Sequence, residues 1–297
     1  MLDFEFKKMQ IGNEILAYRE GGKGERVIVL IHGNMSSSLH FDALMLALEP
    51  HYKIYAPDLR GFGYSSYHER FNSLKSLSED IELFVEKLRL KDFDMLGWST
   101  GGGICLQFAA DNPELVRRLV LVESVGITGY PMYHKDAEGQ PILDKPILTK
   151  EDVALDPVQV RPVLEALEKK DADFYRALWN AAIYTAGNQP DPERYEVYIQ
   201  EMLLQRNLVD IDYSLMYFNM SDEENVYGKG SGDIGKVNCM VDIVQGKNDL
   251  VVPLAMAEGI HKALSPKGNV SYHLLDKCGH NPMVDQLSQL VEIIKAR

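Results

Sequence analysis

The stretch GWSTGGG, residues 97–103, decides the fold of this 297-residue chain. It follows the apolar run DFDML, which predicts a strand, and it leads into ICLQFAA, which predicts a helix. A tight strand-to-helix turn needs small neighbours, and Gly97 and Gly101 supply them on either side of Ser99. Such a turn exposes the serine hydroxyl above the strand end and points the helix N-terminus at it. We therefore interpret Ser99 as a nucleophile, with a purely structural glycine-rich turn as the alternative.

Strands and helices alternate on both sides of this turn. The N-terminal segments FEFKKMQI and EILAYREG alternate in polarity and predict a hairpin. Short apolar runs that predict strands buried on both faces follow in RVIVLIHGN, YKIYAPDLRGFGYSS, DFDMLGWS and VRRLVLVES, and later in CMVDIVQGKND and VSYHLLDKCGH. Between them, Ser76 and Glu79 have the spacing of a capping box for a helix that continues to Leu88. The alternation predicts an α/β fold with a mostly parallel, doubly wound sheet.

A helical insertion interrupts this alternation after the sixth expected strand. From Ile127 to Gly232 the patterns are largely helical. Asp156-Pro157 and Asp191-Pro192 have the residue types expected at the N-cap and first turn of a helix. We therefore expect a first core segment at 1–126, a helical cap or lid at 127–232, and a second core segment at 233–297.

The composition limits the partners and the compartment. The chain has 44 acidic and 31 basic residues, and its net charge of −13 disfavours nucleic acid and anionic membranes as partners. Its three cysteines have no paired spacing and are typical of free thiols in a reducing compartment. The N-terminal stretch lacks the apolar region of a signal peptide, and no apolar run approaches ~18 residues. We expect a soluble cytoplasmic protein with no transmembrane segment; nothing in the sequence sets its oligomeric state.

A serine nucleophile needs a base, and the base needs a carboxylate to orient it. The run GKNDLVVP places Asp249 just past one expected strand, and KCGHNP places His280 just past the next. Each residue alone is more often structural, but together with Ser99, at successive strand ends, they predict a catalytic triad. Glu123, at the end of the strand that follows the helix after Ser99, is an alternative acid.

Two hydrogen-bond donors are needed for the oxyanion that forms during acyl transfer. One is expected to be the backbone N–H of Thr100, directly after the nucleophile. The other is expected from the loop after VIVLIHGN, at the N–H of Asn34, with Met35 as the alternative. In that loop His32 is expected to orient the backbone, and its use as the catalytic base is the alternative.

Several further residues have both structural and functional interpretations. Trp98 either packs beside the turn or lines a pocket, and Cys105 is expected in the core. The insertion is rich in aromatic side chains and methionine, which form the core of the cap or line an apolar cleft. The candidate substrate contacts are Met35, Trp98 and Trp179. No His-Glu-x-x-His or comparable spacing occurs, so neither a metal nor a cofactor is expected.

Five motifs, HGN, DLRGFGYS, GWSTGG, GKNDLVVP and GHNP, fall in the right order at the right strand ends to resemble the α/β-hydrolase superfamily over the whole chain except the cap. The dehalogenase and soluble epoxide-hydrolase branches have Asp at the position of Ser99, so the resemblance implies hydrolysis of esters, lactones or related substrates. Within the serine branch, the Trp-Ser-Thr-Gly-Gly motif and the acidic chain of about this length resemble the intracellular poly(3-hydroxybutyrate) depolymerases of Bacillus type. That resemblance implies hydrolysis of amorphous polyester and association with storage granules.

Other functions remain open at this stage. A carboxylesterase of small acyl esters, a lactonase, a C–C bond hydrolase or a cofactor-free perhydrolase would use the same fold and triad. A non-catalytic ligand-binding protein on the same fold is an alternative from a different class. A granule-surface structural protein whose hydrolytic activity is incidental is another.

Overall fold

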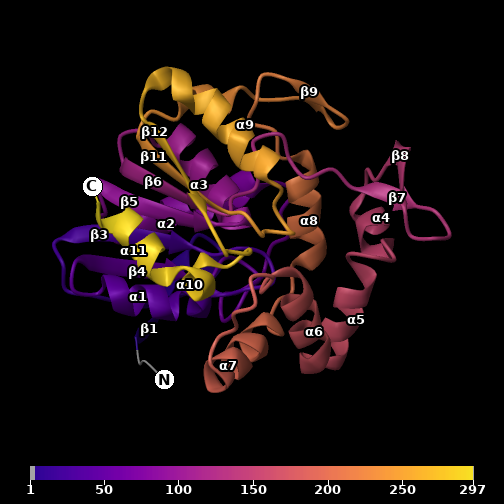
Figure 1. Ribbon diagram of the computed structural model, residues 1–297, viewed down its shortest axis with the longest axis horizontal. Coiled ribbons are helices and arrows are strands. Elements are labelled where there is room, and N and C mark those ends of the chain that lie inside the picture. The colour runs from indigo at the N-terminus through magenta and orange to yellow at the C-terminus, as the bar shows by residue number, and fades with distance from the viewer. Residues whose placement is uncertain (1–3, 297) are drawn as a thin grey trace.

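The computed structural model describes residues 4–296 of the chain, and its centre is one sheet of eight strands (Figure 1). The strands are β1 (Glu5–Ile11), β2 (Glu14–Gly21), β3 (Arg26–Ile31), β4 (Tyr52–Pro57), β5 (Phe93–Trp98), β6 (Val116–Val122), β11 (Met240–Gly246) and β12 (Val270–Leu275). They lie in the order β1-β2-β4-β3-β5-β6-β11-β12. β2 pairs antiparallel with β1 and β4, and every other pairing in this sheet is parallel. The expected hairpin and the mostly parallel sheet are both confirmed.

Helices cover both faces of the sheet. α1 (Asp42–Leu48) and α11 (Leu287–Lys295) pack on one face, and α2 (Leu74–Lys87), α3 (Thr100–Asp111) and α9 (Leu254–Leu264) pack on the other. Within β3, Ile28 and Leu30 belong to the hydrophobic core on the side of α1 and α11. Val29 and Ile31 belong to the core on the side of α2, α3 and α9. Both faces of the strand are therefore buried, which is why its sequence is continuously apolar rather than alternating.

Between β6 and β11 the chain forms a separate set of elements, which we call the cap. Figure 1 shows its helices gathered beside one end of the sheet. The helices are α4 (Lys150–Leu155), α5 (Arg161–Lys169), α6 (Ala172–Ala182), α7 (Pro192–Met202) and α8 (Leu208–Tyr217). Short strand pairs also occur, in β7 (Tyr133–Lys135) with β8 (Pro141–Pro146) and in β9 (Glu224–Asn225) with β10 (Gly228–Lys229).

The β7–β8 hairpin departs from the expectation of a largely helical insertion. Its turn is closed by Asp136, whose carboxylate accepts hydrogen bonds from the backbone N–H groups of Glu138 and Gln140. Gly139 takes a positive φ of 79° in this turn. Local turn chemistry of this kind outweighs weak helical periodicity in a short segment.

Two expected helix starts are displaced. α2 begins one turn early, because the hydroxyl of Ser73 rather than Ser76 caps it and accepts from the Ser76 N–H. Asp156 stands at the end of α4 instead of starting a helix; its carboxylate accepts from the N–H groups of Val158 and Gln159 in the following turn. The expectation for Asp191 is confirmed, since it caps α7 through the N–H of Arg194.

Two further expectations concern the cysteines and the membrane. Cys105, Cys239 and Cys278 are buried free thiols, as predicted. Over residues 4–296, no helix combines the length and the apolar character needed to cross a membrane. The expected core segments begin at residue 1 and end at residue 297, and residues 1–3 and 297 lie outside the described residues.

Candidate active site

Ser99 sits on a strained turn between β5 and α3. Its φ of 56° and ψ of −123° lie in a region that side-chain-bearing residues seldom adopt. The Ser99 N–H donates to the Val122 carbonyl at 2.9 Å, and the Ser99 carbonyl accepts from the Gly102 N–H at 2.9 Å. Among residues 4–296 no hydrogen-bond partner occurs for Ser99 Oγ, so the hydroxyl is free to turn toward a base or a substrate.

Close backbone contacts around Ser99 explain the neighbouring glycines. A Cβ at Gly97 would lie 2.4 Å from the Gly101 carbonyl oxygen, and one at Gly101 would lie 2.2 Å from the Ile31 carbonyl oxygen. A Cβ at Gly33 would lie 2.8 Å from that of Ser99. The turn therefore requires glycine at these positions for space, and the loop after β3 lies directly against the serine.

Asp249 and His280 come from the loops that follow β11 and β12. His280 Nδ1 and Asp249 Oδ2 are 2.8 Å apart, and both side chains are almost fully buried. Asp249 Oδ1 accepts from the N–H groups of Val251 and Val252 at 2.7 and 3.0 Å. Burial opposes ionisation of Asp249, but His280 and these hydrogen bonds hold its pKa below the usual value. Asp249 is thus a fixed anion beside the imidazole.

Ser99 and His280 line a common cavity of about 320 Å³. The three residues expected as substrate contacts, Met35, Trp98 and Trp179, also line it. The Trp98 Nε1–H donates to the His280 carbonyl at 2.8 Å, and the two indole rings meet edge to face with centroids 6.1 Å apart. Trp98 therefore lines the cavity, and its indole also holds the loop that carries His280; its contact with a substrate stays a prediction.

A second cavity, of about 200 Å³, meets the first at Ser99. Asn34, Met35 and Thr100 line it, and Thr100 is the first residue of α3. The Met35 N–H donates to the side-chain oxygen of Asn34 at 2.9 Å and is therefore occupied. Of the two candidate donors in that loop, the Met35 N–H is thus already engaged, and the use of the Asn34 N–H as an oxyanion donor stays a prediction.

His32 lines neither of these cavities. Its Nε2 accepts from the Leu59 N–H at 3.0 Å, and its Nδ1 lies 2.8 Å from the Gly33 carbonyl oxygen. Burial lowers the pKa of the imidazole, so it is neutral. With both nitrogens engaged, His32 orients the loop that carries Asn34 and has no free position for catalysis.

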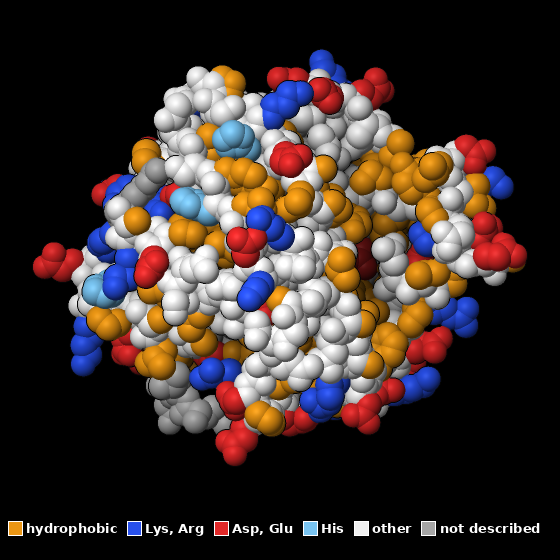
Figure 2. Space-filling model, in the orientation of Figure 1, with side chains coloured by type: hydrophobic (Ala, Val, Ile, Leu, Met, Phe, Trp, Pro, Cys, Tyr) orange, Lys and Arg blue, Asp and Glu red, His pale blue; other side chains and the backbone are white. Residues whose placement is uncertain are grey.

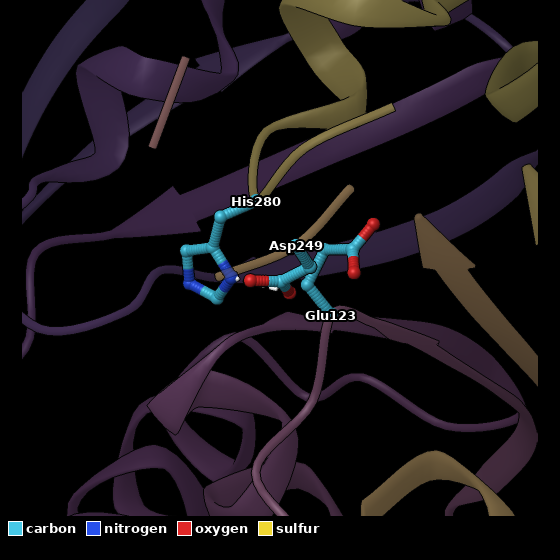
Figure 3. A group of neighbouring side chains, drawn as sticks. All are labelled: Glu123, Asp249 and His280. Atoms are coloured by element: carbon cyan, nitrogen blue, oxygen red, sulfur yellow. Dashed lines mark hydrogen bonds and ion pairs between the residues drawn. The ribbon is translucent and has the colours of Figure 1, made fainter. Parts of the chain in front are cut away.

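Glu123 lies directly behind Asp249. Figure 3 shows Asp249 between His280 and Glu123, and one ligating atom from each lies within 4.8 Å of the others. Glu123 is fully buried, and its Oε1 accepts from the Gly246 N–H at 2.8 Å. Burial and the charge of Asp249 raise the pKa of Glu123 well above the usual value, whereas the pKa of Asp249 is lowered. A protonated Glu123 beside an ionised Asp249 describes these groups better than a metal site, which would need both carboxyl groups ionised.

Asp212, on α8, lines the cavity beside Asn34 and Thr100 and was not among the residues expected at the site. The Asn34 side-chain N–H donates to Asp212 Oδ1 at 3.0 Å, and the Gln205 side chain donates to Asn34 Oδ1 at 2.8 Å. These bonds join the cap to the expected oxyanion loop. No motif contains Asp212, because the contact links positions 178 residues apart.

Comparison with known proteins places this arrangement in a family. Residues 26–287 match the family described as the alpha/beta hydrolase fold, and the chain belongs to that family. An esterase structure from Exiguobacterium antarcticum superposes with a TM-score of 0.71 and 18% identity, covering 98% of each chain.

Among curated relatives, a pimeloyl-[acyl-carrier protein] methyl ester esterase of Nitrosomonas europaea is 24% identical over 91% of this chain and 94% of its own length. A pyrrolizixenacetamide deacetylase of Xenorhabdus hominickii is 33% identical over 116 residues, 39% of this chain. The match spans 43% of that deacetylase and 33–65% of the next four relatives.

Gly101→Ala is expected to destabilise the protein by about 1–3 kcal/mol or more, because the added Cβ meets the rigid Ile31 backbone. Gly259→Ala, in α9, is the matched control, because nothing lies within 4 Å of its added Cβ. Alanine in place of this helical glycine should raise the free energy of unfolding by about 0.5–1 kcal/mol. Urea unfolding of both variants measures the difference. Equal effects on the two midpoints would contradict the close approach of α3 to β3.

Glu123→Gln is expected to gain stability relative to wild type as pH rises. The native protein keeps a proton on Glu123 that the unfolded chain releases above about pH 4.5, so the wild-type free energy of unfolding falls from there upward. The glutamine removes this slope, which is up to about 1.4 kcal/mol per pH unit. Urea unfolding between about pH 5 and 7 measures it. Glu82→Gln, exposed on α2, should show no such trend, and a parallel result for the two variants would exclude a buried neutral Glu123.

Proposed function

We propose that the protein is a serine hydrolase that cleaves carboxylic esters through an acyl-enzyme. The observation that carries the proposal is the cavity that Ser99 shares with His280, whose Nδ1 is held by Asp249. Because Nδ1 is engaged, Nε2 is the nitrogen available to the serine hydroxyl. The strained turn holds Ser99 at the junction of the two cavities, where an ester can reach it from either side.

The reaction follows from these positions. Ser99 Oγ attacks the ester carbonyl while His280 accepts the hydroxyl proton, and the backbone N–H groups of Asn34 and Thr100 receive the developing oxyanion. His280 then returns the proton to the leaving alcohol. A water molecule, activated by the same histidine, attacks the acyl-enzyme and releases the acid and free Ser99. Asp249 stabilises the imidazolium at each stage without taking its proton.

The names of the relatives support the reaction class. The Nitrosomonas europaea relative, which matches nearly the full chain, is a methyl ester esterase, and the Exiguobacterium antarcticum protein of the same fold is an esterase. A small acyl ester or a lactone would satisfy the site equally well.

The finer proposal is that the substrate is an amorphous polyester such as poly(3-hydroxybutyrate). It rests on the resemblance of the Trp-Ser-Thr-Gly-Gly motif and on exposed apolar side chains of the cap and of the loop after β11. Leu143 and Leu155 of the cap are 72% and 67% exposed, and Leu250, next to Asp249 on the core, is 72% exposed. Val158, half exposed, also lines the cavity with Ser99. Figure 2 shows hydrophobic side chains gathered over the cap beside a hollow in this face, a surface suited to a water-insoluble substrate.

Ser99→Ala is expected to reduce ester turnover by roughly 10⁶-fold while leaving the fold intact, because it removes the nucleophile and nothing packed. The measurement is hydrolysis of p-nitrophenyl butyrate together with covalent labelling by a fluorophosphonate. Ser265→Ala, on an exposed serine at the end of α9, is the control and should retain turnover and labelling. Near-normal turnover by Ser99→Ala would refute Ser99 as the nucleophile. A wild type that neither hydrolyses the ester nor is labelled would refute the proposed enzyme and favour a ligand-binding protein.

Release of 3-hydroxybutyrate from amorphous polymer granules is expected from the wild type and not from Ser99→Ala. Chromatography of the soluble products measures it, with p-nitrophenyl butyrate as the parallel substrate. Cleavage of the small ester without release from granules would reject the polyester and retain the esterase. Granule binding that is equal in both proteins, with no release by either, would favour a structural role at the granule surface.

A further inference from the structure

If the proposed ester hydrolysis is correct, each of the two cavities at Ser99 binds one half of the ester. His280 must deliver a proton to the leaving-group oxygen, so the alcohol lies in the cavity that His280 lines. The acyl group then occupies the other cavity, which Asn34, Thr100 and Asp212 line. The alcohol side is bordered mainly by apolar side chains, among them Phe174, Leu178 and Trp179.

Asp212 is a carboxyl group placed in the acyl cavity without a cation. Its Oδ1 accepts from the Asn34 side chain at 3.0 Å, and no lysine, arginine or histidine pairs with it anywhere in residues 4–296. Burial, with the added charge of Asp156, raises its pKa to about 7 against the effect of the Asn34 hydrogen bond. Burial, and after it the charge of Asp212, raises the pKa of Tyr175, whose buried hydroxyl has no partner within the described part of the chain.

Asp210, two residues earlier on α8, is a carboxylate with a structural role and can be compared with Asp212. It is fully buried, and it pairs with Arg70, with Lys150 at 2.9 Å, and with the Tyr67 hydroxyl. These partners lower its pKa although burial opposes them. Asp212 has none of this compensation, so its free oxygen retains hydrogen-bonding capacity that a ligand can use.

We propose that Asp212 is the residue that selects the acyl group, by accepting a hydrogen bond from a hydroxyl carried on the acyl chain near the carbonyl. The Asn34 side chain that Asp212 holds belongs to the same residue whose backbone N–H faces the ester carbonyl oxygen. The carboxyl is therefore placed to reach a substituent only a few bonds from that carbonyl. An acyl chain without a donor leaves Asp212 unsatisfied and binds less well. In a polyester of 3-hydroxy acids only the unit at the hydroxyl end of the chain carries such a donor, because the 3-oxygen of every other unit is esterified.

A neutral hydroxyl fits this carboxyl better than an ammonium group. An ammonium would have to be stripped of water in a cavity that offers only one carboxyl, which is itself partly protonated near pH 7. Among the polar neighbours, Asn34 and Gln159 are neutral, and the Tyr130 hydroxyl already donates to the Val251 carbonyl at 3.1 Å. A hydroxyl can donate to Asp212 whether or not the carboxyl is ionised.

The test compares ethyl esters that share one alcohol, so that only the acyl half varies. Ethyl butyrate is compared with each enantiomer of ethyl 2- and 3-hydroxybutyrate and with ethyl 3-aminobutyrate, by pH-stat titration. For wild type, kcat/KM for one hydroxy ester should exceed that for ethyl butyrate by about 10–100-fold, the range of a hydrogen bond to a charged group. Asp212→Leu should bring this ratio close to one, and Asp212→Asn should give an intermediate value.

Leu215→Ala is the matched control, because Leu215 lies one turn further along α8 and lines the same cavity. This substitution changes the shape of the cavity but keeps the carboxyl group. The ratio of kcat/KM for the preferred hydroxy ester to that for ethyl butyrate should therefore persist. Urea unfolding of each variant establishes that it is folded.

The assignment of Asp212 would be overturned if the wild type cleaved all the esters without preferring a hydroxy ester. It would also be overturned if the preference survived Asp212→Leu. Preference for the amino ester would overturn it in favour of an ammonium ligand. Failure of wild type on every ester, with no fluorophosphonate labelling, would instead reject the ester hydrolase itself.

Discussion

The backbone of Ser99 is the constraint on which the rest of the site depends. Holding a non-glycine residue at φ 56° and ψ −123° costs on the order of 1–3 kcal/mol, which the surrounding packing must offset. It does so through hydrogen bonds from the Ser99 N–H to Val122 and from the Val125 N–H to the Ser99 carbonyl at 3.2 Å. Glycines at 97 and 101 let β5, α3 and the end of β3 approach closely enough to fix that conformation. In this conformation the buried Ser99 borders both cavities.

The parallel sheet then brings the remaining groups to the same edge. β5, β6, β11 and β12 are consecutive neighbours, and their loops carry Ser99, Glu123, Asp249 and His280 in that order. Adjacent strands lie about 4.8 Å apart, so side chains that follow neighbouring strand ends meet without long loops. Residues separated by 31 positions in the chain, Asp249 and His280, form a 2.8 Å contact for this reason.

This geometry also explains what the sequence could and could not predict. The fold, the hairpin and the places of Ser99, Asp249 and His280 follow from apolar runs and from the residues just beyond them, which are local signals. Asp156-Pro157 was misread as a helix start because the same residue types also close a turn after a helix. Asp212 was not predicted at all, since only the packing of the cap against the loop after β3 brings it to Asn34. Cap packing is non-local and has no short sequence signature.

Four carboxyl groups in and around the site illustrate how environment, rather than residue type, assigns a role. Asp249 is held ionised by His280 and backbone donors, while Glu123, directly behind it, is kept neutral by burial and by that same charge. Asp210 and Asp212 lie on one helix, yet cations hold the pKa of the first below its usual value and burial raises that of the second to about 7. An ionised carboxylate can orient an imidazole, and a neutral acid can donate to that carboxylate. A carboxyl group that faces a cavity and has no cation beside it can still accept a hydrogen bond from a ligand. Asp249, Glu123 and Asp210 are therefore engaged within the protein, whereas Asp212 keeps an oxygen with which it can bind the substrate.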